Sequence, residues 1–233
     1  MKKKIYIIGI LCLCFCALQA QKMKVQNQPY GDQRLYHFGI SVGANFQDML
    51  MDNTGYTTDG ETWYAQIPNY SPGFTVGILA NMYLNPYMSL RTNPSIHFGD
   101  KAFLFTKENT EETYQTSVRS NYLMIPFDIK FATRRLNNYR PYFLAGIYAA
   151  MDLGRKKGEA LLMKPMDYGF ELGFGCDFYL PIVKVCPEIK FCFGLADILE
   201  KNRSDLTDKE LMKYPNALSK GNSRMIVITF NFE

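Results

Sequence analysis

The stretch DYGFELGFGCDFYL, Asp167–Leu180, places an apolar side chain at every second position. Successive side chains of a β-strand point to opposite faces, so this alternation predicts a strand with one apolar face. That face is formed by Phe170, Leu172, Phe174, Cys176, Phe178 and Leu180. What it touches decides the class of protein: the core of a soluble domain, the interior of a ligand-binding barrel, or lipid.

Seven further segments repeat the alternation and complete a predicted set of eight strands. The connections between them are, in chain order, long, short, long, modest, longer, short and long. In an antiparallel up-and-down sheet, this order places the long connections at one end and both chain termini at the other. Such a layout is typical of an outer-membrane barrel, and eight strands suit a small closed one. The segments are residues 35–46, 73–84, 87–98, 122–131, 141–151, 167–180, 183–195 and 224–233.

The residues between the apolar positions favour lipid, rather than water, outside the barrel. A soluble lipocalin-like barrel would put the apolar face inside and a surface dense in Lys, Glu and Thr outside. Here the alternating positions hold Gly, Ser, Asn and Tyr with isolated charges of both signs, which suit a narrow lumen. The sequence therefore predicts an all-β, eight-stranded antiparallel transmembrane β-barrel of the outer-membrane type. Its predicted lumen charges are Arg91, Asp128, Lys130, Glu171, Asp177, Lys184, Glu188 and Lys190.

Two local features of the strands carry further predictions. Pro94, Pro126 and Pro187 lie inside predicted strands, where each removes a backbone donor, so we expect bulges or broken pairing there. The strand at 141–151 has the weakest alternation, and we expect Phe143, Ala145, Ile147 and Ala149 to face outward.

The strands at 167–180 and 183–195 can pair in two registers. If paired residue numbers sum to 361, Asp177 faces Lys184 and Glu171 faces Lys190. If they sum to 363, Pro181 takes a better turn position, but both acidic residues face cysteines. Opposite charges across a ladder stabilise a sheet by about 0.2–1 kcal/mol each, which favours the sum of 361.

The N-terminus predicts export from the cytoplasm. Three lysines precede an apolar run that ends in Ala17-Leu18-Gln19-Ala20, the pattern of a secretory signal peptide cleaved after residue 20. Residues 21–34 are predicted to be a flexible lead-in and residues 35–233 the barrel domain. The chain has no internal run of 18 apolar residues, so no helical membrane span is predicted. The predicted location is the outer membrane of a Gram-negative cell, with its lipid as a partner.

The sequence contains no recognisable catalytic or metal-binding constellation. His37 and His97 are single residues of lumen parity without clustered ligands, and there is no phosphate loop or dinucleotide fingerprint. We therefore predict no enzyme activity, no cofactor and no metal, and we identify no small-molecule substrate. The run Arg155, Lys156 and Lys157 is interpreted as a basic loop, either a solvated face or a contact for lipopolysaccharide phosphates.

Charge and cysteine content narrow the class further. Loss of residues 1–20 removes three lysines and no acidic residue, which lowers the net charge from +4 to +1 and gives no indication of nucleic-acid binding. Three of the six cysteines leave with the signal peptide. The remaining Cys176, Cys186 and Cys192 are interpreted as small packing residues.

Seven short motifs follow one another along the chain: YHFGISVGANF, SPGFTVGILANMYLN, YLMIPFDIKF, PYFLAGIYAAMDLGRKK, DYGFELGFGCDFYLP, CPEIKFCFGL and VITFNFE. Taken in order, they resemble the PorT family of Bacteroidota outer-membrane β-barrels. The resemblance implies a component of the type IX secretion system that is needed to export cargo proteins, with other secretion-system proteins as partners. It carries no catalytic residue across. The chain departs from the usual terminal aromatic residue, because Phe232 is followed by Glu233.

Two functions remain open at this point. The first is a non-enzymatic secretion component that is accessory to a larger translocon. The alternative is a structural or adhesive outer-membrane barrel whose extracellular loops bind ligands.

Overall fold

The computed structural model describes residues 25–55, 57–58, 61–66, 71–107, 113–155, 161–201, 203, 215 and 217–233. The predicted signal peptide, residues 1–20, lies outside these ranges. Within them, no helix is long and apolar enough to cross a membrane.

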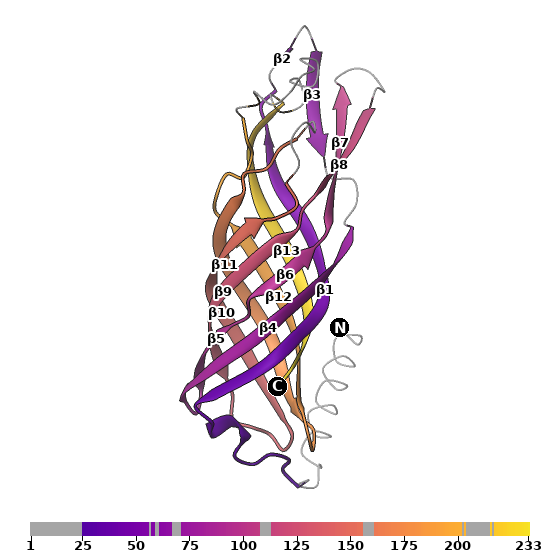
Figure 1. The fold of residues 1–233 in the computed structure, drawn as a ribbon. Coiled ribbons are helices and arrows are strands. Elements are labelled where there is room, and N and C mark those ends of the chain that lie inside the picture. The colour runs from indigo at the N-terminus through magenta and orange to yellow at the C-terminus, as the bar shows by residue number, and fades with distance from the viewer. Residues whose placement is uncertain are drawn as a thin grey trace, which may run out of the picture.

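The strands form a closed antiparallel ring, as predicted (Figure 1). The hydrogen-bonded order is β1-β13-β12-β11-β10-β9-β5-β4, and β4 pairs back onto β1. β5 and β6 are two halves of one crossing, so the ring has eight strands. Their bounds are β1 Tyr36–Asn53, β4 Pro72–Asn85, β5 Met88–Thr92, β6 Ser95–Phe98, β9 Tyr122–Ala132, β10 Tyr139–Asp152, β11 Met166–Tyr179, β12 Lys184–Gly194 and β13 Leu218–Phe232.

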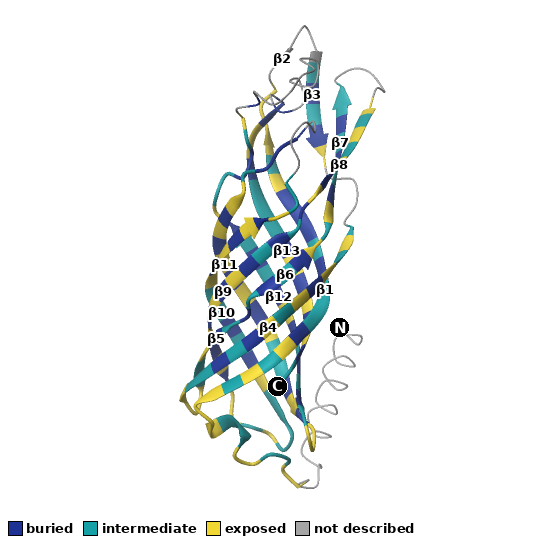
Figure 2. Cartoon of the chain, viewed as in Figure 1, coloured by how far each residue is buried: buried dark blue, intermediate teal, exposed yellow. Residues whose placement is uncertain are grey.

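Burial alternates along each strand of the ring (Figure 2). On β10, Tyr142, Leu144 and Tyr148 are buried inside, while Ile147 is 65% exposed on the outer wall. The outward orientation expected for this strand is therefore confirmed. Apolar side chains cover the outer wall, among them Phe38, Ile40, Phe74, Ile78, Ile125, Phe127, Ile129, Phe131, Phe170, Leu172, Phe174, Ile189, Ile226, Ile228 and Phe230.

The three prolines interrupt pairing where expected. Pro94 lies in the gap between β5 and β6. These two strands pair with β9 as far as Arg91–Asp128 and again from Ser95–Met124, and the pairing is absent between these pairs, where Pro126 lies on β9. Opposite Pro187, the pairing of β11 with β12 stops at Gly175 and resumes at Phe178. The residue sums are unchanged across both gaps, so the pairing is broken without a bulge.

The favoured register of β11 and β12 is wrong. Paired residues sum to 363, so Glu171 faces Cys192 and Gly173 faces Lys190. The hairpin is centred between Pro181 and Ile182, with Leu180 N–H donating to the carbonyl of Val183. This centre gives proline the first central position of the turn, which its fixed φ angle favours. Pairing of opposite charges does not favour the sum of 361 over 363, because a long side chain also reaches its diagonal neighbour across the ladder.

A second sheet lies beyond one end of the ring, which we call the distal end. It contains β2 Thr57–Thr58, β3 Glu61–Gln66, β7 Asp100–Lys107 and β8 Thr113–Arg119, in the order β2-β3-β7-β8. We call these four strands the distal sheet. β2 and β3 lie in a stretch that was predicted to be a long polar loop, residues 47–71. β7 and β8 continue β6 and β9, and thus extend the flanking strands into the polar stretch at residues 99–121. The distal sheet contributes side chains to a cluster of buried apolar residues, which we call the distal core. The distal core is formed by Met49, Trp63, Ala65, Phe103, Phe105, Val118, Leu161, Met163, Ile198, Leu199, Ala217 and Leu218.

The opposite, proximal end carries the connections β4–β5, β9–β10 and β11–β12, together with residues 25–34. The predicted lead-in is fixed to the barrel over these residues. Arg135 donates to the carbonyl of Gln28 at 3.1 Å, and Tyr179 donates to the Asp32 carboxylate at 2.7 Å. Asn27 also bonds to Asn138. The flexibility expected of residues 21–34 stays a prediction.

Candidate functional site

The charges predicted for the lumen all lie inside the ring. Each of the eight is at most 5% exposed. They come from β5, β9, β11 and β12, whose inward parity places them at successive heights along the barrel axis. The structure brings them together in two groups, one around Arg91 and Lys130 and one around Lys190.

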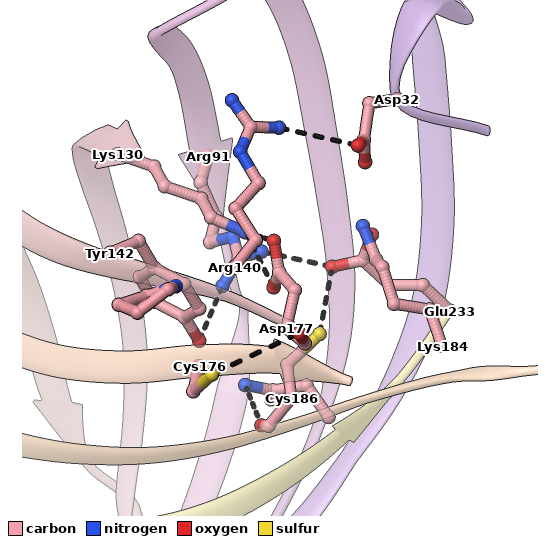
Figure 3. A network of polar contacts seen from close by, with 12 residues as sticks. Asp32, Arg91, Lys130, Arg140, Tyr142, Cys176, Asp177, Lys184, Cys186 and Glu233 are labelled. Atoms are coloured by element: carbon pink, nitrogen blue, oxygen red, sulfur yellow. Dashed lines mark hydrogen bonds and ion pairs between the residues drawn. The ribbon is translucent and has the colours of Figure 1, made fainter. Parts of the chain in front are cut away.

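Arg91 lies at the centre of the first group. Its guanidinium contacts Glu188 at 3.0 Å and Glu233 at 2.9 Å, and Tyr142 donates a 2.7 Å hydrogen bond to Glu188. All three partners are buried. Lys184 pairs with the same Glu233 carboxylate. Figure 3 shows Arg91, Tyr142, Lys184 and Glu233 converging in the barrel interior.

The ring of Tyr142 joins this group to a second ion pair. Lys130 Nζ lies 2.7 Å from both oxygens of Asp177 and 3.9 Å from the centre of the Tyr142 ring. Arg91 lies 5.3 Å from the same ring centre. Cations over an aromatic face are stabilised by its quadrupole. The tyrosine therefore fills space between two cations that would otherwise repel each other.

Lys190 is shared by three carboxylates in the second group. Its Nζ lies 2.7 Å from Glu171, 3.6 Å from Asp128 and 3.8 Å from Glu188. Glu171 is reached across the diagonal of the ladder, since its direct neighbour is Cys192. Charge neutralisation of Glu171 thus occurs as the sequence suggested, although through a different register.

Two members of the network were missed from the sequence. Tyr142 follows Pro141 in the strand with the weakest alternation. Glu233 was noted only as a departure from a terminal aromatic residue. Its inward position could have been found by parity, since Thr229 and Asn231 of the same strand are buried inside.

The lumen is packed so tightly that two strand positions have no room for a side chain larger than that of glycine. A Cβ on Gly146 would lie 2.2 Å from a carboxylate oxygen of Asp128, and one on Gly175 would lie 2.3 Å from the Tyr142 ring. Two hollows inside the barrel measure about 20 Å³ each, near Lys130 and near Tyr122. Each has room for roughly one water molecule. An ion network of this density, rather than an aqueous path, occupies the barrel interior.

The remaining candidates form no reactive centre in the described part of the chain. His97 bonds to the hydroxyls of Thr75 and Ser95 at 2.9 Å each. Cys176, Cys186 and Cys192 are free thiols. Among the described residues, no group of three or more His, Cys, Asp or Glu could hold a metal ion.

The predicted basic loop is described only at its first residue. Arg155 forms an ion pair of 3.7 Å with Glu200. Lys156 and Lys157 lie outside the described residues. A contact between this loop and lipopolysaccharide phosphates stays a prediction.

A hollow lies at the proximal end, near the ion network. It measures about 680 Å³ and lies between residues 28–38, the β11–β12 turn and Glu233. Its walls combine Arg34, His37 and Lys184 with the apolar side chains of Tyr36 and Ile182. The hollow opens at the barrel end and leads to the filled lumen.

Comparison with known proteins places this architecture. A family model described as "Outer membrane protein beta-barrel domain" matches residues 19–200. No curated protein matches the chain. The structure is similar to OprG of Pseudomonas aeruginosa, with 11% identity over 84% of this chain and 93% of that one and a TM-score of 0.49.

Two further solved structures are similar to this chain. Neisserial surface protein A matches with 11% identity over 84% of this chain and 97% of that one, at a TM-score of 0.45. Ail of Yersinia pestis, in complex with the heparin analogue sucrose octasulfate, matches with 12% identity over 84% and 96%, at a TM-score of 0.35. The family match covers most of the chain and agrees with a closed ring of antiparallel strands and an apolar outer wall. The chain therefore belongs to the outer-membrane β-barrel domain family and resides in the outer membrane of a Gram-negative cell.

Proposed function

We propose that this barrel is a non-enzymatic, accessory component of the type IX protein-secretion machinery. The motifs that resemble the PorT family supply the secretion system. The filled lumen is the observation that carries the proposal, because it indicates that cargo does not pass through this barrel and that its role is accessory. Its other secretion-system partners would bind the loops, the turns or the lipid-facing wall.

The argument from the lumen is one of size. Arg91 and Lys190 each pair with more than one carboxylate in the interior, Lys130 pairs with Asp177, and the two small hollows hold roughly one water molecule each. A polypeptide cargo needs a passage many times wider. Opening one would separate several buried ion pairs, each of which is costly to break. Cargo therefore passes through another protein while this barrel assists.

The proposal is tested by deleting the gene in its host. Type IX cargo should then accumulate in the periplasm, while other outer-membrane proteins assemble at normal levels. Complementation with the wild-type chain should restore export. A variant in which Lys130→Gln and Asp177→Asn remove one ion pair together should restore it equally, because no transport path is altered.

Two results would contradict the proposal. Normal cargo export in the deletion strain would remove the secretion role. Conduction of large solutes by the purified barrel in a planar bilayer would contradict the accessory role, because it would show a passage through the barrel itself.

A second candidate function is a structural or adhesive barrel that binds outside partners. The folded distal sheet favours it, because that sheet lies beyond the membrane and has an apolar core of its own. In this case the deletion strain secretes cargo normally but loses binding of an external partner or integrity of the envelope. The same strain thus separates the two functions.

A further inference from the structure

The charged side chains on the outward face of the ring lie on two neighbouring strands, β1 and β13, towards their distal ends. β1 contributes Asp48 and Asp52, and β13 contributes Lys220 and Arg224. Asp48 lies opposite Arg224 in the ladder, and Asp52 lies opposite Lys220. The other outward positions of the ring strands, which the structure describes from end to end, hold no Asp, Glu, Lys or Arg. Lipid-facing positions usually exclude charge, so these four residues identify a part of the wall with different surroundings.

The Asp48–Arg224 pair lies at the boundary between the lipid-facing wall and the external region. Directly on its proximal side, Phe46 faces Ile226, and the outward residues of both strands from there towards the membrane centre are apolar. On its distal side, Asn222 begins a polar part of β13. The inward side of β1 changes from polar to apolar at the same height, between residues 47 and 49. Both sides of the wall therefore place this pair where lipid ends and external water begins.

A hollow of about 310 Å³ opens on the outer wall on the proximal side of this pair. Phe46 of β1 borders it on one side, and Phe191 and Phe193 of β12 border it on the other. Ile226 of β13 lies between them, and its smaller side chain, 36% exposed, leaves a depression. Arg224 lines the distal end. The hollow is thus an apolar furrow with a cation at its distal end, and we call it the β13 furrow.

Arg224 is anchored by Asp48 and remains accessible. Its Nε donates to Asp48 at 2.9 Å, and its Nη2 donates to the same carboxylate oxygen. Asp48 is buried, whereas the side chain of Arg224 is 42% exposed. A guanidinium carries five N–H donors in a planar fork, which matches the oxygens of a phosphate. The anchored cation can therefore receive a phosphate from outside the barrel without leaving Asp48.

We propose that the β13 furrow binds a phosphate-bearing lipid of the outer leaflet. One acyl chain lies over Ile226 between the phenylalanine rings, and the phosphate contacts Arg224 at the boundary. An apolar furrow alone would accept any hydrocarbon chain, and an exposed arginine alone would accept any anion. Because the two adjoin at the height where lipid ends, they select a molecule that has both parts, with its phosphate on the external side of its chain.

The orientation of the barrel assigns this lipid to the outer leaflet. Short connections join β4 to β5 and β11 to β12 at the proximal end, and the short turns of outer-membrane barrels lie in the periplasm. The distal end, where Arg224 lies, is therefore external. The site does not depend on the secretion role, so its failure would leave that proposal unchanged.

The test compares two lipids on the purified full-length mature barrel in detergent. One is phosphorylated lipid A, and the other is the same lipid after removal of its phosphate groups. Native mass spectrometry measures the binding of each. We expect saturable binding of phosphorylated lipid A and about tenfold weaker binding of the dephosphorylated form, because the latter lacks the charged contact with Arg224. Inorganic phosphate should not displace the lipid. Equal binding of the two lipids, or displacement by inorganic phosphate, would overturn the proposal.

A substitution in the furrow tests the acyl-chain contact. Ile226→Trp fills the depression without changing any charge and should weaken binding of phosphorylated lipid A about tenfold. Ile129→Trp is the matched control, because Ile129 is similarly exposed, at 38%, on the outer wall of β9, which neighbours none of the three strands of the furrow. It should change binding less than about twofold. Equal effects of the two substitutions would show that the lipid does not lie in the furrow.

A paired substitution tests the phosphate contact. Arg224→Gln combined with Asp48→Asn removes both charges together, so that no buried carboxylate is left unpaired. This variant should bind the two lipids equally well. Lys220→Gln is the matched control, because it removes a cation from the same face about 13 Å further out, beyond the Debye length of about 8 Å at physiological ionic strength. It should keep the preference for phosphorylated lipid A.

A preference that survives in the paired variant would overturn the assignment to Arg224. Gel migration before and after boiling verifies that each variant forms the closed barrel. If the paired variant does not fold, the comparison of the two lipids on the wild-type chain still decides whether the phosphate is recognised, and Ile226→Trp still decides where the lipid lies.

Discussion

The barrel and the distal core are built from the same strands with opposite polarity. On the inward side of β1, Ser41, Asn45 and Gln47 lie in the lumen, and Met49 follows them into the distal core. The inward face therefore changes from polar to apolar between residues 47 and 49, without a break in the strand. The surroundings change at the same height. Lipid covers the outer wall of the barrel, so apolar side chains gain nothing by turning inward there. Water surrounds the distal sheet, so its apolar side chains stabilise the fold by burial.

The single tryptophan makes the two regions separately measurable. Trp63 lies in the distal core, so its fluorescence reports the distal region alone. Migration on a gel before and after boiling reports the barrel, because a closed barrel resists SDS. A substitution can then be assigned to one region by which signal it moves.

The largest effect is expected inside the barrel. Arg91→Met leaves the buried carboxylates of Glu188 and Glu233 without their shared cation. Removing one partner of a buried pair costs about 3–5 kcal/mol in the free energy of unfolding. The temperature at which the folded gel band disappears should fall clearly. A Lys130→Gln, Asp177→Asn double variant should lose less than Lys130→Gln alone, because it leaves no unpaired charge. Equal losses would show that the lumen is hydrated enough to screen its charges.

The second largest effect is expected when a charge is placed on the outer surface, because its cost should differ between the barrel and the distal sheet. Ile147→Lys places an ammonium on the lipid-facing wall near the middle of β10 and should cost about 2–4 kcal/mol in the free energy of unfolding in bilayers. Gln115→Lys places the same group on the exposed face of β8, where the change should stay within about 0.5 kcal/mol. Urea titration in lipid vesicles measures both. A similar cost at both positions would contradict the boundary between lipid and water drawn here.

A smaller effect is expected when one methyl group is removed in each region. Ile198→Val in the distal core should cost about 0.5–1.5 kcal/mol, visible as an earlier transition in Trp63 fluorescence. Ile228→Val on the outer wall of β13 should leave the gel transition nearly unchanged, because lipid fills the space of the lost methyl. A large effect at Ile228 would indicate that protein, rather than lipid, covers this part of the wall.

The smallest effect concerns pH at the distal end. Partial burial acts to raise the pKa of Asp197, but N–H groups of Gly221 and Leu199 and the charge of Lys164 outweigh it and hold that pKa below its ordinary value. Such a carboxylate stabilises the fold above its unfolded pKa, about 3.9, and loses this effect as pH falls through the lower folded pKa. The Trp63 transition should therefore shift slightly to lower temperature as the pH falls below about 4. Asp197→Asn should abolish that shift, and an identical acid response in the variant would disprove the assignment.

The identity, number and inward parity of the strands in the ring were determined by the sequence alone. Alternation with period two is a local property, so it named the outward residues of β10 and the eight lumen charges without knowledge of any partner strand. The same rule would have found Glu233. The broken pairing at Pro94 was likewise predictable, because proline lacks a backbone N–H donor wherever it occurs.

Tertiary structure decided what depends on segments that are distant along the chain. The register of β11 and β12 followed turn geometry, because Lys190 reaches Glu171 diagonally and the charges therefore favour neither sum decisively. The distal sheet pairs β3 with β7, which lie far apart in sequence, and neither segment alternates strongly enough to be recognised alone. The sharing of Lys190 among three carboxylates from three strands was equally invisible. Period and parity are fixed by each strand's own backbone, whereas register, pairing and charge sharing are fixed only when strands meet.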